Sequence, residues 1–345
     1  MLNRYLSLAI CFGIVASASG QFSKKAKRST HKQATHRIKK PFDERKYTCL
    51  GFSVNAMNYY GDLSPRPSRF STDLKFTRPS FELSVSHKYG PNFSVQARFL
   101  TGMLQGDDEE SSNPNDENGR YRYRRNASFR NSITEFSVIS IFEFPSNHGF
   151  YMHRHQVTYY LFAGFGVFYN NPKAKAPSHD LAGNPLPEAG KWVDLQPLGT
   201  EGQFSNLEPT DANFGIKPYR RVQPCIPVGI GLRYRVNHTV DFWIDYSFRY
   251  LFTDYIDDVS RNYVDLGVLN NDLARTFSYR GHEIGPSQLH TYVGRDGQQY
   301  VVQPGYGSEH PDNKRGSPKD KDIFTVFSLR ISKIINSNMH KAKSR

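Results

Sequence analysis

Residues 226–260 read IPVGIGLRYRVNHTVDFWIDYSFRYLFTDYIDDVS, two alternating runs that meet at a short polar turn. From Ile226 to Phe252 every even-numbered residue outside the turn is apolar or aromatic, while the odd-numbered positions include glycine, serine, arginine and aspartate. A period of two with one apolar face predicts β-strands, because helical spacing would scatter these residues around the axis. Each run has at least ten residues, about the length with which a tilted strand crosses a bilayer.

The two faces of this hairpin indicate a membrane. The apolar face ends in tyrosine and phenylalanine, as an interfacial aromatic girdle does. The opposite face carries full charges, which a dry protein core would reject. Because Val236 and Val240 must share a face, we expect a three-residue loop at 237–239.

Similar alternation recurs along the chain, and the connections between the alternating segments predict the topology. We expect eight strands between Thr48 and Ile334, with the hairpin as the sixth and seventh. Their connections cover residues 59–78, 89–92, 105–126, 145–155, 170–222, 237–239 and 253–322. Long and short connections alternate, which is typical of bacterial outer-membrane barrels with short periplasmic turns and long outer loops. The predicted fold is all-β: an eight-stranded antiparallel transmembrane β-barrel in the bacterial outer membrane, with both termini periplasmic.

The predicted interior of this barrel is charged. An eight-stranded barrel is just wide enough inside to be filled by its own side chains. The hairpin register places Arg235 opposite Asp241, and Arg233 diagonal to Asp241 and Asp245. We expect the inward side chains, which carry both signs, to form a structural plug of ion pairs rather than an aqueous channel. The predicted lumen ionic network consists of Glu82, Arg98, Glu135, Arg233, Arg235, Asp241, Asp245, Arg249 and Arg330.

The net charge of +13 resides at the two ends of the chain. Residues 21–47 contain ten Lys or Arg and two acids, residues 333–345 contain four Lys or Arg and no acid, and residues 48–332 are net neutral. The basicity therefore does not indicate nucleic-acid binding. It predicts either two solvated tails or docking to an acidic partner or lipid surface. The candidate partner residues in the tails are Lys24, Lys25, Lys27, Arg28, Lys39, Lys40, Lys341 and Lys343.

The first twenty residues have the pattern of an export signal. Arg4 precedes an apolar core at 6–15, and small residues at 16–20 suit cleavage. The mean hydropathy of −0.63 agrees with a barrel, because alternation halves the apolar content of each spanning strand. The predicted domains are a signal peptide at 1–20, a basic disordered periplasmic tail at 21–47, the β-barrel at 48–334 and a basic tail at 335–345.

Seven strings stand out beyond their periodicity. They are NYYGDL at 58–63, GDD at 106–108, RNASFRN at 125–131, FAGFGVFYNNP at 162–172, LQPLGTEGQ at 195–203, IPVGIG at 226–231 and FTDYIDDVS at 252–260. In this order they resemble a family of Bacteroidota outer-membrane β-barrels of largely unassigned function. That family includes PorG, a barrel associated with the type IX secretion and gliding machinery. The resemblance covers about Tyr47 to Val268 and returns at the last strand.

The resemblance implies an eight-stranded barrel that helps to tether the periplasmic ring of the secretion machine to the outer membrane. The implied partners are periplasmic or lipoprotein ring subunits and outer-membrane lipid, and we expect no cofactor and no nucleic acid. The chain departs from the family in its longer basic N-terminal extension and in its continuation at 336–345. The most family-specific stretch is the family-motif loop, formed by Asp254, Tyr255, Asp257, Asp258 and Ser260.

The same long loop has residue types that suit hydrolysis. Asp254, Asp257 and Asp258 would have to act with His282 or His290 as acid and base for water activation. Asp and Asn in loops more often cap turns or pair with arginine. The sequence also has no Gly-x-Ser-x-Gly elbow to nominate a serine nucleophile. We therefore expect no catalytic site.

Two further clusters contain metal-ligating residue types. Residues 107–110 and 113–119 are rich enough in oxygen for calcium, but their order does not match an EF-hand loop. His148, His153 and His155 would need a further ligand to hold zinc. We expect a solvated acidic loop and interfacial histidines rather than metal sites.

The leading functional hypothesis is a non-enzymatic barrel that serves as an anchor or scaffold for a periplasmic assembly. The two tails and the connection at 145–155 would be its contact surface. One alternative is a surface-loop hydrolase that uses the connection at 253–322. The other is a small-solute porin.

Overall fold

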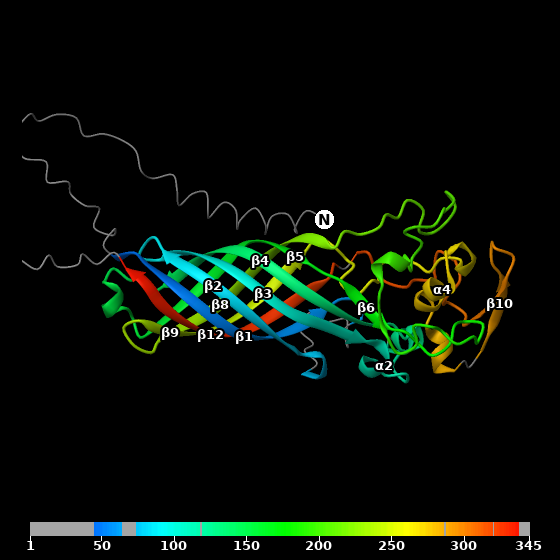
Figure 1. Cartoon of the computed structure of the whole chain (residues 1–345), viewed down its shortest axis with the longest axis horizontal. Coiled ribbons are helices and arrows are strands. Elements are labelled where there is room, and N and C mark those ends of the chain that lie inside the picture. The colour runs from blue at the N-terminus through cyan, green and yellow to red at the C-terminus, as the bar shows by residue number, and fades with distance from the viewer. Residues whose placement is uncertain (1–44, 64–73, 118, 286–287, 320, 338–345) are drawn as a thin grey trace, which may run out of the picture. The chain divides into compact units, whose positions relative to one another are not determined.

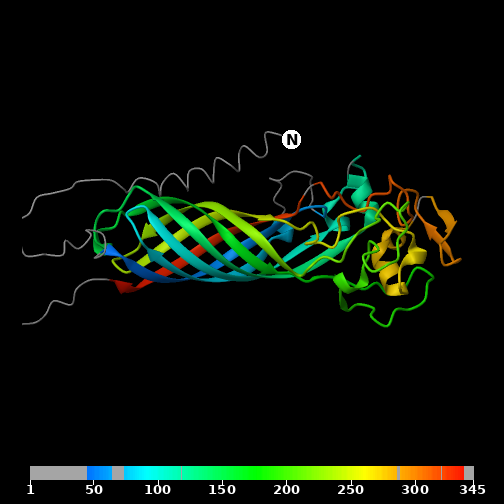
Figure 2. The same ribbon diagram turned by 90° about the horizontal axis from the view of Figure 1, so that it is seen from above.

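The computed structural model describes residues 45–63, 74–117, 119–285, 288–319 and 321–337, which all fall in one compact unit. Eight long antiparallel strands close into a barrel (Figures 1 and 2). Each strand pairs with its neighbours along the chain, and the first pairs with the last, which confirms the predicted fold class. The strands are β1 (Tyr47–Tyr60), β2 (Arg78–Lys88), β3 (Phe93–Asp107), β4 (Ser128–Phe144), β5 (Val157–Tyr169), β8 (Val222–Arg235), β9 (Val240–Leu251) and β12 (Ile323–Ser337).

Shorter elements lie in the connections. The sheet is extended at β4 by β6 (Pro172–Lys175) and β7 (Trp192–Asp194), and a separate hairpin is formed by β10 (His290–Val293) and β11 (Gln299–Val302). Within the described part of the chain, no helix is long and apolar enough to cross a membrane. The helices are α2 (Asp108–Ser111), α3 (Gly119–Arg125) and α4 (Asp272–Ser278), with 3-10 turns η2 (Leu74–Phe76), η3 (Tyr151–His153), η4 (Gln196–Leu198), η5 (Leu266–Val268) and η6 (Gly281–Ile284).

The barrel strands alternate between an apolar exterior and a polar interior. Phe165 and Ile230 on the exterior are 64% and 60% exposed, whereas Asp245 and Arg330 inside are buried. A continuous apolar band of this kind would be unfavourable in water. An apolar wall around a polar lumen is the pattern of a bilayer-spanning outer-membrane barrel.

The register of the β8–β9 hairpin is the one that the sequence predicts. Arg235 lies opposite Asp241. The turn closes where the Val236 amide donates to the Val240 carbonyl at 3.0 Å. The two valines therefore share a face, as the alternation requires.

The barrel extends slightly beyond its predicted bounds. β1 begins at Tyr47 rather than Thr48, and β12 continues to Ser337 rather than ending at Ile334. Residues 335–337, predicted as tail, belong to the strand because Tyr47 pairs with Ser337 across the β1–β12 seam. Outside the described residues lie the predicted signal peptide and the candidate partner residues Lys24, Lys25, Lys27, Arg28, Lys39, Lys40, Lys341 and Lys343.

The four long connections gather at one end of the barrel, which we call the loop end, and the three short turns lie at the other, the turn end (Figures 1 and 2). The described parts of 61–77, 108–127, 170–221 and 252–322 form the loop cap. The cap has its own buried apolar clusters, so it is a folded structure rather than a set of separate loops. The larger cluster contains Tyr263, Val264, Leu266, Leu269, Ala274, Tyr279, Val302 and Tyr306.

Candidate functional site

Ion pairs fill the barrel lumen at three levels, and the middle level joins two arginines to two carboxylates. Arg330 Nη2 lies 3.2 Å from Glu82 Oε1 and 2.9 Å from Asp245 Oδ2. Arg98 lies 3.7 Å from Glu82 and 3.6 Å from Asp245. All four side chains are buried, and the Tyr160 hydroxyl donates to Asp245 at 2.9 Å. Charge is therefore balanced within the cluster, as buried ions require.

The other two levels lie toward the two ends of the barrel. Toward the loop end, Arg249 Nε lies 3.1 Å from Glu135 Oε2. Toward the turn end, Glu143 pairs with Arg233 at 2.9 Å and also with Lys88. Lys88 and Glu143 were not predicted as lumen residues, although the alternation of their strands points both of them inward.

The predicted role of Arg235 needs correction. Its side chain is half-buried, and its guanidinium donates to the Met152 carbonyl at 3.1 Å rather than to a carboxylate. The carboxylate of Asp241 is instead held by Arg154, whose Nη2 lies 2.7 Å from Oδ1. Arg154 enters the lumen from the connection between β4 and β5, where no periodic pattern predicts an inward side chain.

Aromatic and aliphatic side chains occupy further space in the lumen. Tyr160 and Phe162 point inward because glycines face them: a Cβ on Gly231 would lie 2.3 Å from Tyr160 Cζ, and one on Gly229 would lie 2.5 Å from Phe162 Cζ. These side chains explain the irregular alternation in strands β4 and β5. The buried cluster consists of Ile139, Ile141, Tyr160, Phe162 and Trp243.

A group of carboxyl side chains joins the loop cap to the barrel, and we call it the acidic junction. The Tyr59 hydroxyl on β1 lies 2.6 Å from Asp257 Oδ2 and 2.8 Å from Asp322 Oδ1. A phenol has one hydrogen to donate, so the Tyr59 hydroxyl cannot donate fully to both carboxyl groups, and a proton on either carboxyl would supply the second hydrogen bond. The junction comprises Asp62, Asp108, Glu201, Asp254, Asp257, Asp258 and Asp322.

Asp258 holds the family-motif loop to the neighbouring connection. Its φ of +66° lies in the left-handed region, which aspartate tolerates better than most residues. The Asp258 carboxylate accepts hydrogen bonds from Thr200 at 2.6 Å and from Tyr219 at 2.7 Å. Arg315 supplies the opposite charge at 3.8 Å.

Glu201 is the second contact between these connections. Its Oε1 accepts from the Ser260 amide at 2.9 Å and from Arg315 at 3.1 Å, and its Oε2 accepts from the Tyr255 hydroxyl at 3.1 Å. The Ser260 hydroxyl in turn donates to Asp254 at 2.7 Å. Every residue of the family-motif loop is thus engaged in contacts within the junction.

Five of the seven family strings meet at this junction. Their proximity was not predicted, because connections that pack by irregular contacts have no periodic sequence pattern. The one sequence feature that these residues share is that they belong to the family strings. The strings contribute Tyr59, Asp62, Asp108, Arg125, Glu201, Asp254, Tyr255, Asp257, Asp258 and Ser260.

Burial raises the pKa of Asp254 to about 7 and the pKa values of Asp62 and Asp258 to about 6. Burial also raises the pKa of Asp257 and of Asp322 well above the usual range. The closed cap therefore binds protons that an open cap would release. Its stabilisation by these groups is complete below about pH 4 and is lost as the pH rises through their raised pKa values.

We expect amide hydrogen exchange in residues 252–262 to accelerate between about pH 5 and about pH 8, after correction for intrinsic rates. Asp254→Asn should flatten the part of this dependence near pH 7, because an amide does not titrate there. Exchange measured by mass spectrometry would test this, with Asp312→Asn on the exposed surface of the cap as the control. Identical pH profiles for Asp254→Asn and the wild-type protein would contradict the prediction.

The residues considered for hydrolysis have other partners. Asp254 is bonded to Ser260, and His282 Nδ1 contacts the carbonyl of Tyr279 at 3.2 Å. His290 lines a separate cleft in the cap. Neither histidine is a hydrogen-bond partner of these aspartates, so their contacts are those of a structural junction.

The residues considered for metal binding either form other hydrogen bonds or are exposed on the surface. Asp107 caps α2 through its side chain. His155 contacts the carbonyl of Ser146 at 3.2 Å, and His148 and His153 are exposed. Throughout the residues that the structure describes, no group of three or more His, Cys, Asp or Glu side chains is arranged to hold a metal ion.

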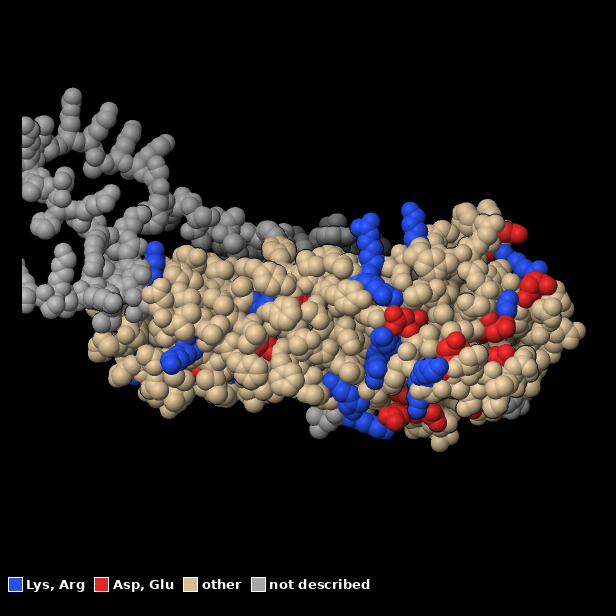
Figure 3. Space-filling model, in the orientation of Figure 1, with Lys and Arg blue, Asp and Glu red and all other residues tan. Residues whose placement is uncertain are grey.

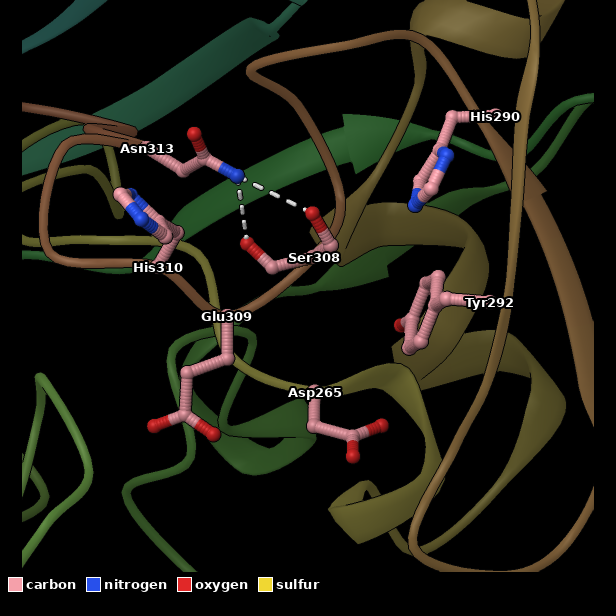
Figure 4. Close-up of a pocket in the computed structure, with 7 residues that line it drawn as sticks. All are labelled: Asp265, His290, Tyr292, Ser308, Glu309, His310 and Asn313. Carbon is pink, nitrogen blue, oxygen red and sulfur yellow. Dashed lines mark hydrogen bonds between the residues drawn. The ribbon is translucent and has the colours of Figure 1, made fainter.

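The loop cap contains a cleft of about 530 Å³. Figure 4 shows His290 and Tyr292 on one side of it and His310 and Asn313 on the other. Asn313 donates to the backbone and side-chain oxygens of Ser308, both at 3.0 Å. Much of the polar lining is therefore committed to bonds within the cap. The lining residues are Asp265, His290, Tyr292, Ser308, Glu309, His310 and Asn313.

The fold and the filled lumen define an eight-stranded barrel of the outer-membrane class. Residues 40–177 match the model of a domain of unknown function, DUF6089. A comparison with curated proteins found no match.

Solved structures similar to this chain include three outer-membrane barrels. Neisserial surface protein A is 8% identical, with a TM-score of 0.35 over 83% of this chain and 96% of its own. Ail of Yersinia pestis is 8% identical, with a TM-score of 0.34 over 85% and 99%. OprG of Pseudomonas aeruginosa is 5% identical, with a TM-score of 0.35 over 86% and 98%.

Proposed function

We propose that the protein is a non-enzymatic outer-membrane barrel that anchors a periplasmic assembly, with the ring of a type IX secretion machine as the leading candidate. The filled lumen favours an anchor over a porin, because paired side chains occupy the path that a solute would take. The order of the family strings supports the choice of partner. In this proposal the loop cap faces the outside and the turn end faces the periplasm.

The observation that carries the proposal is a fixed surface at the turn end. Tyr47, the first residue of β1, pairs with Ser337, the last residue of β12, so the first and last strands of the barrel have neighbouring ends on this surface. Arg45 contacts the carbonyl of His148, and its guanidinium carbon lies 5.6 Å from the centroid of the Phe150 ring. Arg45, two residues before β1, therefore contacts the turn that joins β4 to β5. Phe150 remains 40% exposed and available to a partner.

A photocrosslinking residue at position 150 should capture periplasmic or lipoprotein ring subunits in cells, because it lies on this surface. The matched control is position 301, where Val301 is 49% exposed on β11 of the loop cap. Removing residues 21–44 and 338–345 should weaken recovery of the same subunits. Capture of the ring from position 301 but not from position 150 would overturn the proposal.

A further inference from the structure

A row of basic side chains follows the loop end of the barrel wall. Arg78 on β2 donates to Gln105 of β3 from Nε at 3.0 Å and from Nη2 at 2.7 Å. Gln105 lies opposite Arg130 on β4, which lies opposite Lys173 on β6. Figure 3 shows Lys and Arg gathered in a band between the mostly uncharged barrel wall and the loop cap.

The row holds more cations than acids. Lys173 and Arg221 share the carboxylate of Asp194, at 2.7 and 3.4 Å. The guanidinium carbon of Arg130 lies 3.9 Å from the centroid of the Trp192 ring, and Trp192 is 39% exposed. Four cations therefore accompany one carboxylate, and an aromatic ring holds one of the guanidinium groups in place.

The row lies directly beyond the apolar band. Tyr169 pairs with Thr134, which lies four residues after Arg130 on β4, or about 14 Å along the strand toward the apolar band. Tyr169 and Val222 at this rim are 43% and 57% exposed. An acyl chain against the band would place its headgroup at the height of the basic row.

We infer that this row binds phosphorylated headgroups of the lipids around the loop end, which form the outer leaflet in the proposed orientation. Guanidinium groups bind phosphate through paired, charge-assisted hydrogen bonds. A row suits headgroups that lie side by side in the membrane plane, and the apolar band adds contacts that a free anion cannot make. From the sequence, the two basic tails were the candidates for docking to a lipid surface. The basic row is separate from them, because it lies within residues 48–332, which are net neutral.

The test uses the full chain in zwitterionic detergent, titrated with lipid A and followed by native mass spectrometry. Replacing Arg130, Lys173 and Arg221 together by Gln should weaken lipid A binding about 100-fold, since each cation contributes roughly fivefold at an anionic surface. Binding by the wild-type chain should also weaken as salt is added. The control carries the same charge change on the loop cap: Arg124→Gln, Lys314→Gln and Lys319→Gln.

Fluorescence provides a second measurement that needs no charge variant. The chain has two tryptophans, and Trp243 is buried in the lumen, so a spectral change on lipid A binding should come from Trp192 and vanish in Trp192→Phe. Inorganic phosphate at the same concentration should neither give this change nor displace lipid A. Equal binding by the triple variant and the control, or a Trp192 response to inorganic phosphate alone, would overturn the inference.

Discussion

Arg330→Leu should lower the free energy of unfolding by about 3–5 kcal/mol, because it removes the closer of the two arginines that pair with two buried carboxylates. Arg330 lies within 3.2 Å of Glu82 and 2.9 Å of Asp245, and both carboxylates are buried. The ion pairs with Arg98 would then remain, at the longer distances of 3.7 and 3.6 Å. Urea unfolding of the barrel in lipid vesicles, followed by electrophoretic mobility, would measure the loss.

The matched control for this variant is Lys333→Leu. Lys333 lies on the same strand but faces outward and is exposed, so the same change of charge should cost little. Similar stabilities for the two variants would mean that water screens the lumen charges, and the lumen would then not be plugged.

Arg125→Leu should open the loop cap while leaving the barrel intact. The Arg125 guanidinium donates to both carboxylate oxygens of Asp108, at 2.7 and 2.8 Å, and to the carbonyls of Arg315 and Asp62, both at 2.7 Å. It thereby joins three connections, and its loss leaves a buried carboxylate unpaired at a cost of about 3–5 kcal/mol to local closure. Hydrogen exchange and limited proteolysis should both report the opening.

The control for the cap is Arg124→Leu, one residue earlier and exposed. Exchange in the barrel strands should match the wild-type protein in both variants, since no barrel strand depends on Arg125 for its pairing. Loss of protection throughout the barrel in Arg125→Leu would show that cap and barrel unfold as one unit, contrary to this prediction.

The barrel was predictable because each strand obeys a local rule. The segment between the predicted connections 145–155 and 170–222 was assigned as a strand even though its aromatic residues face both ways, and in the structure β5 spans Val157–Tyr169. Applying the same rule to every strand would also have found Lys88 and Glu143, whose positions share the inward parity of Glu82 and Glu135.

The junction was not predictable in the same way, because its contacts depend on how irregular connections fold. Tyr59 meets Asp257 across 198 residues of chain, and Arg125 meets the carbonyl of Arg315 across 190. No periodic pattern encodes such pairs. Arg154 was not predicted as a lumen residue for a related reason. Its side chain enters the lumen from a turn, where the alternation of the strand has already ended.

The convergence of the family strings changes what they indicate. Asp257 and Asp258 lie under the cap and are almost fully buried, so they are not a surface presented to a partner. Tyr59, Thr200 and Tyr219 saturate their carboxylates with hydrogen bonds. The buried residues of these strings therefore contribute to the packing of the cap on the barrel.

The position of Arg330 on the final strand links the charge balance of the lumen to closure of the wall. β12 closes the wall by pairing with β1 on one side and β9 on the other. Without β12, Glu82 and Asp245 would keep Arg98 but lose the closer of the two arginines between them. A barrel without β12 would have two open edges and one more carboxylate than arginine at the middle level of its lumen. Pairing of β12 removes both defects, so charge balance at the middle level of the lumen and completion of the wall depend on the same strand.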